Sequence, residues 1–259
     1  MWRKFVSFDS YARPEQQCVV ERILDSYGEN ILYSSPLHLI IHRSAPNTEF
    51  GAPEAQYKAD KPPQIRLSPS FFTKPLETQE AVLFHELMHY EMTERYPYDF
   101  NLRKLSRYNP QRNFEIAVSF ILGEVLGWAE TFKRFPNAAL YYVYYGNSFA
   151  NLFKMSGEAL QEMNASPRFE IIAMLRSFYY LLVVLALHDL ICCPWVPMNH
   201  DRNFLSPVLA EQYSSIYAII RNFIEKPYSL ESIALLHDEL RVTLQNYVDA
   251  TVPQQDTSS

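Results

Sequence analysis

The sequence predicts a predominantly helical α+β protein, with a small β-sheet in its N-terminal half and an all-helical C-terminal lobe. The chain has 259 residues, of which 48% are hydrophobic, so it can bury a sizeable core. It contains 6 glycines beside 18 tyrosines and 17 phenylalanines. Few glycines and long apolar runs favour helices over tight-turned β architectures.

The N-terminal half combines helices with two short strands. Apolar residues at helical spacing predict a first helix over Pro14–Tyr27, with Gly28 as its stop signal. Residues 37–42 and 64–68 are short segments bounded by prolines, with β-branched residues, and we expect both to be strands. The stretch between them, residues 45–63, is rich in proline and charge and is expected to be a surface loop.

Long helices are expected in the rest of the chain. One has Pro75 in its first turn, contains residues 81–96 and is stopped by Pro97. The next covers residues 114–134 and is followed by Pro136. Later helices, the last with Ser229 as its N-cap, are expected over residues 138–155, 168–193, 208–225 and 230–250.

The change from mixed to wholly helical patterning places a domain boundary near residue 135. Residues 1–135 are expected to form a core that includes the strands, and residues 136–250 a helical lobe packed on it. Residues 251–259 are short and polar and are expected to be a disordered tail.

Charge and cysteine content narrow the class of protein. The formal net charge is -6 and no basic block is present, which argues against nucleic acid as a partner. Three sparse cysteines, Cys18, Cys192 and Cys193, do not form a disulfide framework and are expected to be reduced thiols. The N-terminus has no apolar signal region, so a cytoplasmic location is expected, with signal-independent export left open.

One apolar run has nearly the length of a membrane span. Residues 177–193 are interrupted by His188 and Asp189 and are closed by Pro194. We therefore expect a buried helix here rather than a transmembrane or membrane-associated segment.

The stretch that indicates function is HELMH, residues 85–89. On a helix, residues four apart share one face, so His85 and His89 can direct two imidazoles to the same point. Two such histidines are suitable ligands for a zinc ion, and Glu86 between them can take a proton from a zinc-activated water. The alternative is a helix with two exposed histidines, but Leu83 and Leu87 make an apolar setting that does not suit unpaired imidazoles.

These residues resemble the active-site motif of the zincin metallopeptidases. Val82 matches the Val or Thr three positions before the first histidine, and uncharged residues occupy several flanking positions, whereas Glu91 stands where a hydrophobic residue is usual. The resemblance covers roughly residues 37–133. It implies a zincin-like core in which the strand 64–68 is the sheet edge above the cleft, and an extended peptide or protein substrate that pairs with this strand.

Zinc needs a third protein ligand, and the sequence offers three glutamates for it. No third histidine follows His89 at the spacing of metzincins, so the motif is more similar to gluzincins, in which a glutamate on a later helix completes the site. Glu124 lies on an apolar face of the helix 114–134, which a carboxylate tolerates only with a partner. It is therefore the expected ligand, with Glu130 as the alternative and Glu115 third.

Two further considerations bear on this choice. Gly127, three residues after Glu124, would let another helix approach closely. If Glu124 is not a ligand, it is expected to form a buried salt bridge with an arginine such as Arg112 or Arg176.

The expected function is a zinc-dependent hydrolase, specifically a peptidase, in which Glu86 is the general base. An oxyanion donor is also needed, and the sequence does not separate the candidates, which are His188, His200 and the tyrosines Tyr141, Tyr142, Tyr144 and Tyr145. A cytoplasmic protease and an exported effector or toxin both fit. The alternative is a zinc-binding scaffold or regulatory module that binds proteins without cleaving them.

Overall fold

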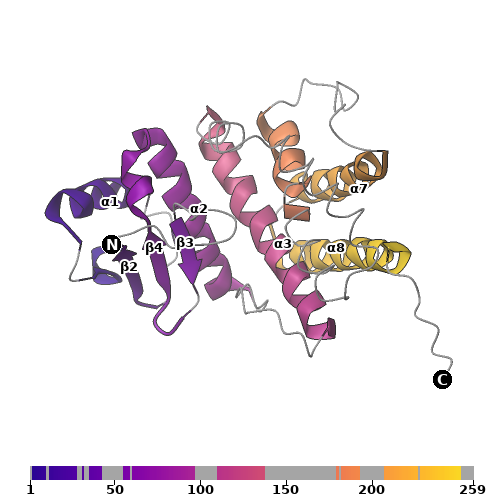
Figure 1. Cartoon of the computed structure of the whole chain (residues 1–259), viewed down its shortest axis with the longest axis horizontal. Helices are drawn as coiled ribbons and strands as arrows, with labels where there is room; N and C mark the ends of the chain where they lie inside the picture. The colour runs from indigo at the N-terminus through magenta and orange to yellow at the C-terminus, as the bar shows by residue number, and fades with distance from the viewer. Residues whose placement is uncertain are drawn as a thin grey trace.

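A small sheet with two helices beside it makes the N-terminal part of the molecule, and long helices make the remainder (Figure 1). This computed structural model describes residues 2–9, 12–27, 31, 35–42, 55–58, 60–96, 110–137, 179–180, 182–192, 207–226 and 228–251. The predominantly helical α+β class predicted from the sequence is confirmed.

The sheet has four short strands in the order β1-β2-β4-β3. The strands are β1 (Val6–Phe8), β2 (Leu37–Ile41), β3 (Ala55–Lys58) and β4 (Gln64–Leu67). The first two pairings are parallel, whereas β3 runs antiparallel to β4. Alternate residues of β2, β3 and β4 are buried, which is the period-2 pattern of strands with one face on a core.

Two sequence-based expectations about the sheet are wrong. The stretch 45–63, expected to be a loop, contains β3, and the strand 64–68 is not the edge of the sheet because β4 pairs on both sides. β3 has only 4 residues, and although its sequence AQYK alternates between apolar and polar side chains, so short a run does not by itself predict a strand. The strand forms because it pairs with β4. The edge strand on this side of the sheet is therefore β3, which pairs only with β4 among the described strands.

The helices largely follow the prolines and caps that the sequence shows. The helices are η1 (Trp2–Lys4), α1 (Pro14–Tyr27), η3 (Pro69–Thr73), α2 (Leu76–Arg95), α3 (Pro110–Arg134), the π-helical η5 (His188–Cys192), α7 (Pro207–Ile224) and α8 (Leu230–Thr251). Residues 179–180 and 182–187, which precede η5 within the expected helix 168–193, are helical as well.

Two helix ends agree with the caps expected from the sequence. Pro75 stands at the start of α2, and the Ser229 hydroxyl accepts a hydrogen bond from the Ser232 amide at 3.0 Å, as expected of the N-cap of α8. The helix expected over residues 138–155 lies outside the described residues, and so does the tail from residue 252. Within the described residues, no helix is both long and apolar enough to cross a membrane.

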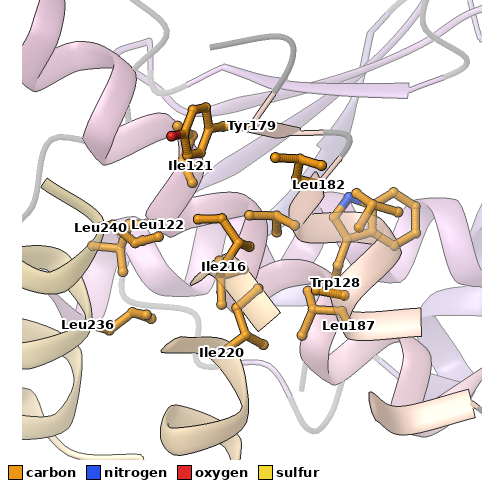
Figure 2. Close-up of a cluster of buried hydrophobic side chains, with 14 of the residues drawn as sticks. Ile121, Leu122, Trp128, Tyr179, Leu182, Leu187, Ile216, Ile220, Leu236 and Leu240 are labelled. Atoms are coloured by element: carbon orange, nitrogen blue, oxygen red, sulfur yellow. The ribbon is translucent and has the colours of Figure 1, made fainter. Parts of the chain in front are cut away.

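Two hydrophobic clusters make up the interior. One joins the sheet to α1 and to the apolar residues of α2, including Leu83, Phe84 and Leu87. The other joins α3 to residues 179 and 182–187, α7 and α8, and Figure 2 shows Ile121 and Trp128 of α3 among the side chains of this second cluster. Each buried large apolar side chain contributes about 1.5–3 kcal/mol to folding.

Helix α3 lies between the two halves of the molecule, with α2 and the sheet on one side and α7 and α8 on the other (Figure 1). Its apolar face packs with the C-terminal helices, and its opposite side meets α2. The α2–α3 contact is the place where the two clusters meet. The division into domains near residue 135 stays a prediction.

Candidate metal centre

Helix α2 places two histidines on one side, facing α3. His85 is 6% exposed and His89 is half-buried, and their Nε2 atoms are 2.9 Å apart. This proximity follows directly from the i, i+4 spacing of the motif. The two imidazole rings stand nearly perpendicular, with an interplanar angle of 86°. Both Nε2 atoms therefore converge on one point, as the sequence predicts.

Helix α3 brings Glu124 to that point. Glu124 is 7% exposed, and its two carboxylate oxygens lie 3.4 Å from His85 Nε2 and 3.5 Å from His89 Nε2. A carboxylate on the apolar side of a helix is thus explained by its position beside two imidazoles. The sequence-based preference for Glu124 among the three glutamates agrees with this placement.

The competing residues lie elsewhere. Glu130 forms an ion pair with Lys133 at 2.8 Å, and Glu115 forms one with Arg241 of α8 at 3.0 Å. Arg112, an alternative partner for Glu124, is exposed on the first turn of α3, and Arg176 is outside the described residues. The ion-pair partners of Glu124 within the described part of the chain are the two histidines.

Gly127 explains how α3 comes so close to His85. A Cβ atom at this position would stand 3.0 Å from His85 Cε1, 3.1 Å from His85 Nδ1 and 3.5 Å from His89 Cε1. The expectation that Gly127 permits a close helix approach is confirmed. The next residue, Trp128, covers the His85 ring with its indole, at 4.2 Å between ring centroids and 33° between planes. Glutamate, glycine and tryptophan from one turn of α3 thus enclose the histidine pair.

The charged forms of Glu124 and of the nearby histidines stabilise one another. Burial disfavours an ionised Glu124, but the attraction of His89 and His85 outweighs burial and lowers the pKa of Glu124 to about 2. For His89, burial likewise disfavours the charged form, and the nearby carboxylates of Glu124 and Glu86 nevertheless raise its pKa. The carboxylate is therefore negative at neutral pH and ready to bind a cation.

The donor set fits a zinc ion. The candidate ligand atoms of His85, His89 and Glu124 all lie within 4.8 Å of one another. Tetrahedral zinc with bonds of 2.0–2.1 Å needs neighbouring ligand atoms about 3.3 Å apart, close to the separations described above. In addition, Glu124 Oε2 is buried and forms no hydrogen bond with the residues that the structure describes. Two imidazoles and a carboxylate are a common zinc ligand set.

Glu86 lies beside this group and also contacts the sheet. Its Oε2 accepts a hydrogen bond of 2.5 Å from the backbone N–H of Tyr57 in β3, and its charge acts on His89. The sequence does not point to Tyr57, because the proline and charge of residues 45–63 predict a loop. A backbone donor also leaves no side-chain signal in a sequence.

Other candidates from the sequence are apart from this group or outside the described residues. His188 is buried in η5, where its Nδ1 is 3.3 Å from Asp189 Oδ1, and the Tyr213 hydroxyl donates to the same carboxylate. Its ring lies 6.2 Å from that of Phe132. His188 is thus a core histidine with a local partner. His200 and the tyrosines between residues 141 and 145 are outside the described residues.

The assignment of this centre rests on its own geometry. No protein-family model, no curated protein and no solved structure matches this chain. The structure thus contains a buried group of two histidines and one glutamate, on α2 and α3, that could hold a metal ion.

Proposed function

We propose that the protein is a zinc-dependent hydrolase, and specifically a metallopeptidase. The observation that supports this most strongly is the convergence of His85, His89 and Glu124 from two helices on one point. Three protein ligands leave one position open on a tetrahedral ion, and an open position distinguishes catalytic from structural zinc sites. The resemblance to zincins around the HELMH motif, residues 85–89, supports a peptide or protein as the substrate.

Each residue of the site has a role in this proposal. His85, His89 and Glu124 hold the ion, which when bound supplies Lewis acidity and lowers the pKa of water. Glu86, the neighbour of His85, accepts a proton from the attacking water and later passes it to the leaving amine. Trp128 covers His85 and keeps water from one side of the imidazole. The low pKa of Glu124 keeps this carboxylate ionised throughout the working pH range.

Metal analysis of purified variants tests the site. Wild type is expected to carry about one zinc per chain, and Glu124→Ala and Glu124→Gln to lose most of it. Glu124→Gln preserves side-chain volume, so circular dichroism on it separates loss of zinc from loss of fold. The matched control is Glu115→Ala on the same helix, which should retain zinc because Glu115 pairs with Arg241 on the far side. A wild-type protein without zinc affinity, or a Glu124→Ala variant with full zinc content, contradicts the site.

A cleavage screen then separates a peptidase from a scaffold. Wild type and Glu86→Gln are incubated with a proteome-derived peptide library, and new termini are identified by mass spectrometry. Glu86→Gln should keep zinc and lose cleavage, because its amide cannot accept the proton of water. If zinc-loaded wild type cleaves nothing, or if Glu86→Gln cleaves as wild type does, the proposed peptidase mechanism is wrong.

A further inference from the structure

On the outer edge of β3, one backbone amide is hydrogen-bonded to a side chain of α2. In an antiparallel pair, the backbone groups of alternate residues point towards the partner strand and away from it. Tyr57 stands opposite Ile65 of β4, yet its N–H donates to Glu86 Oε2 at 2.5 Å, so this amide points away from β4. The Glu86 carboxylate occupies the place where a further strand would offer a carbonyl oxygen.

A second contact holds β3 against α2 independently of Glu86. The Tyr57 side chain is 8% exposed, and its ring meets that of Tyr90 edge-on at 6.3 Å between centroids. Tyr90 lies one turn after Glu86 on α2, and its hydroxyl donates to the Ser35 carbonyl at 2.7 Å. The backbone of β3 is therefore anchored next to Glu86 by ring packing, and the Tyr57 N–H meets the carboxylate from a fixed position.

We propose that Tyr57 is a positioning residue, whose backbone N–H orients Glu86 for proton transfer. This inference rests on the proposed function. A glutamate has several rotatable bonds and would otherwise sample many orientations in an open site. Binding one carboxylate oxygen to the sheet leaves Oε1 to accept the proton of the attacking water. Because a general base works only within hydrogen-bond reach of that proton, loss of the orienting amide should lower turnover rather than zinc binding.

The first test measures the hydrogen bond without any activity. The Tyr57 amide is followed by ¹H–¹⁵N NMR in wild type and in Glu86→Ala. We expect its proton resonance to move upfield in the variant, and its hydrogen exchange to become about tenfold faster or more. The Gln56 and Lys58 amides are internal controls, because these residues flank Tyr57 in the same strand and point towards β4. An unchanged Tyr57 resonance and exchange rate overturns the proposal.

The second test removes the N–H itself. Tyr57→Pro lacks the donor and Tyr57→Ala keeps it, while both lose the aromatic ring, so their difference isolates the amide. Proline is tolerated on edge strands where the N–H points away from the sheet. We expect both variants to bind zinc, and the kcat of Tyr57→Pro to fall about 10- to 100-fold below that of Tyr57→Ala, with KM changed much less.

The outcomes are distinguishable from failure of the proposed function. Equal kcat values for Tyr57→Pro and Tyr57→Ala overturn the positioning role alone, since the peptidase activity then persists. A zinc-loaded wild type that cleaves no peptide overturns the proposed function and this inference with it. If Tyr57→Pro does not fold, the NMR comparison of wild type with Glu86→Ala still decides whether the amide holds the carboxylate.

Discussion

At the scale of single residues, Gly127 determines how closely α3 can approach the histidine pair. A Cβ atom at this position would lie 3.0 Å from His85 Cε1, closer than most real Cβ atoms come to a neighbour, so the imidazole would have to shift to admit it. His85 is also confined on another side by Trp128. The imidazole therefore has little room to yield, and a methyl group at Gly127 would move it away from Glu124.

Gly127→Ala is expected to weaken zinc binding by about 10- to 100-fold, the usual effect of disturbing the surroundings of a metal ligand. The measurement is competition with a zinc-binding dye. Alanine in place of a helical glycine normally stabilises by about 0.5–1 kcal/mol, so a fall in affinity without a fall in helicity indicates a displaced ligand. The control is Ile121→Val, which costs about 0.5–1.5 kcal/mol of stability and should leave zinc affinity unchanged. Equal zinc affinity in Gly127→Ala and wild type would show that His85 does not need this space.

At the scale of elements, Tyr90 ties α2 to the chain that leads into β2. Its hydroxyl donates to the Ser35 carbonyl at 2.7 Å and accepts from the Ser35 N–H at 3.2 Å. The Tyr90 side chain is fully buried, and it also meets the ring of Tyr57 in β3. The helix that bears both histidines is thus held to β3 and to the segment before β2 through one side chain.

Tyr90→Phe is expected to lower the free energy of unfolding by about 1–3 kcal/mol, because both Ser35 backbone groups lose a buried partner. Urea unfolding measures the loss. Ser35→Ala is the matched control: it removes only the hydroxyl bond to Glu94 and keeps both backbone bonds to Tyr90, so its cost should stay below about 1 kcal/mol. A larger loss for Ser35→Ala than for Tyr90→Phe would place the anchor in the serine hydroxyl instead.

At the scale of the whole molecule, the candidate metal centre joins the two hydrophobic clusters. Its histidines come from α2, whose apolar residues belong to the cluster with the sheet, and its glutamate comes from α3, which packs with the C-terminal helices. A bound ion would therefore link the two halves of the fold at the place where they meet.

Zinc is expected to raise the stability of both halves together. A free zinc concentration 100 times the dissociation constant should add about 2.7 kcal/mol to the free energy of unfolding, and a chelator should remove this gain. Thermal unfolding followed by circular dichroism and by tryptophan fluorescence reports on the change, because Trp2 and Trp128 lie in different clusters. Glu124→Gln should not respond to zinc. A wild-type unfolding midpoint that is the same with zinc and with chelator would contradict the site.

Alkaline pH should destabilise the fold through its buried tyrosines. Burial raises the pKa of Tyr57 to about 12 and raises that of Tyr179 as well, above the ordinary value of 10.0. Above pH 10 the unfolded chain loses these protons before the folded chain does, so stability is intact below pH 10 and falls as pH rises towards 12. The slope is at most about 1.4 kcal/mol per pH unit for each tyrosine.

Urea unfolding midpoints at roughly pH 8, 9.5 and 11 measure this dependence, because these values span the pH range in which tyrosines ionise. Tyr179→Phe should show a shallower decline than wild type, although its bond to Gln212 is also lost. A midpoint that stays constant up to pH 11 would mean that these phenols ionise without unfolding the protein.

The sequence by itself determined the local half of the candidate site. The HELMH spacing places His85 and His89 on one helical face because a helix repeats every 3.6 residues, and no distant contact is needed for this. Glu124 was also within reach of sequence reasoning, because a carboxylate on an apolar helical face needs a partner. The helical class and the N-cap at Ser229 depend on equally local patterns.

Only the tertiary structure decided what joins these pieces. The β3 strand forms because β4 pairs with it, so its sequence alone did not predict the sheet edge or the Tyr57 N–H that meets Glu86. The sequence indicated a close approach at Gly127, but the packing of α3 on α2 decided that His85 is the group approached. Local periodicity fixes which side chains share a face, whereas contacts between elements far apart in the chain depend on how the faces pack.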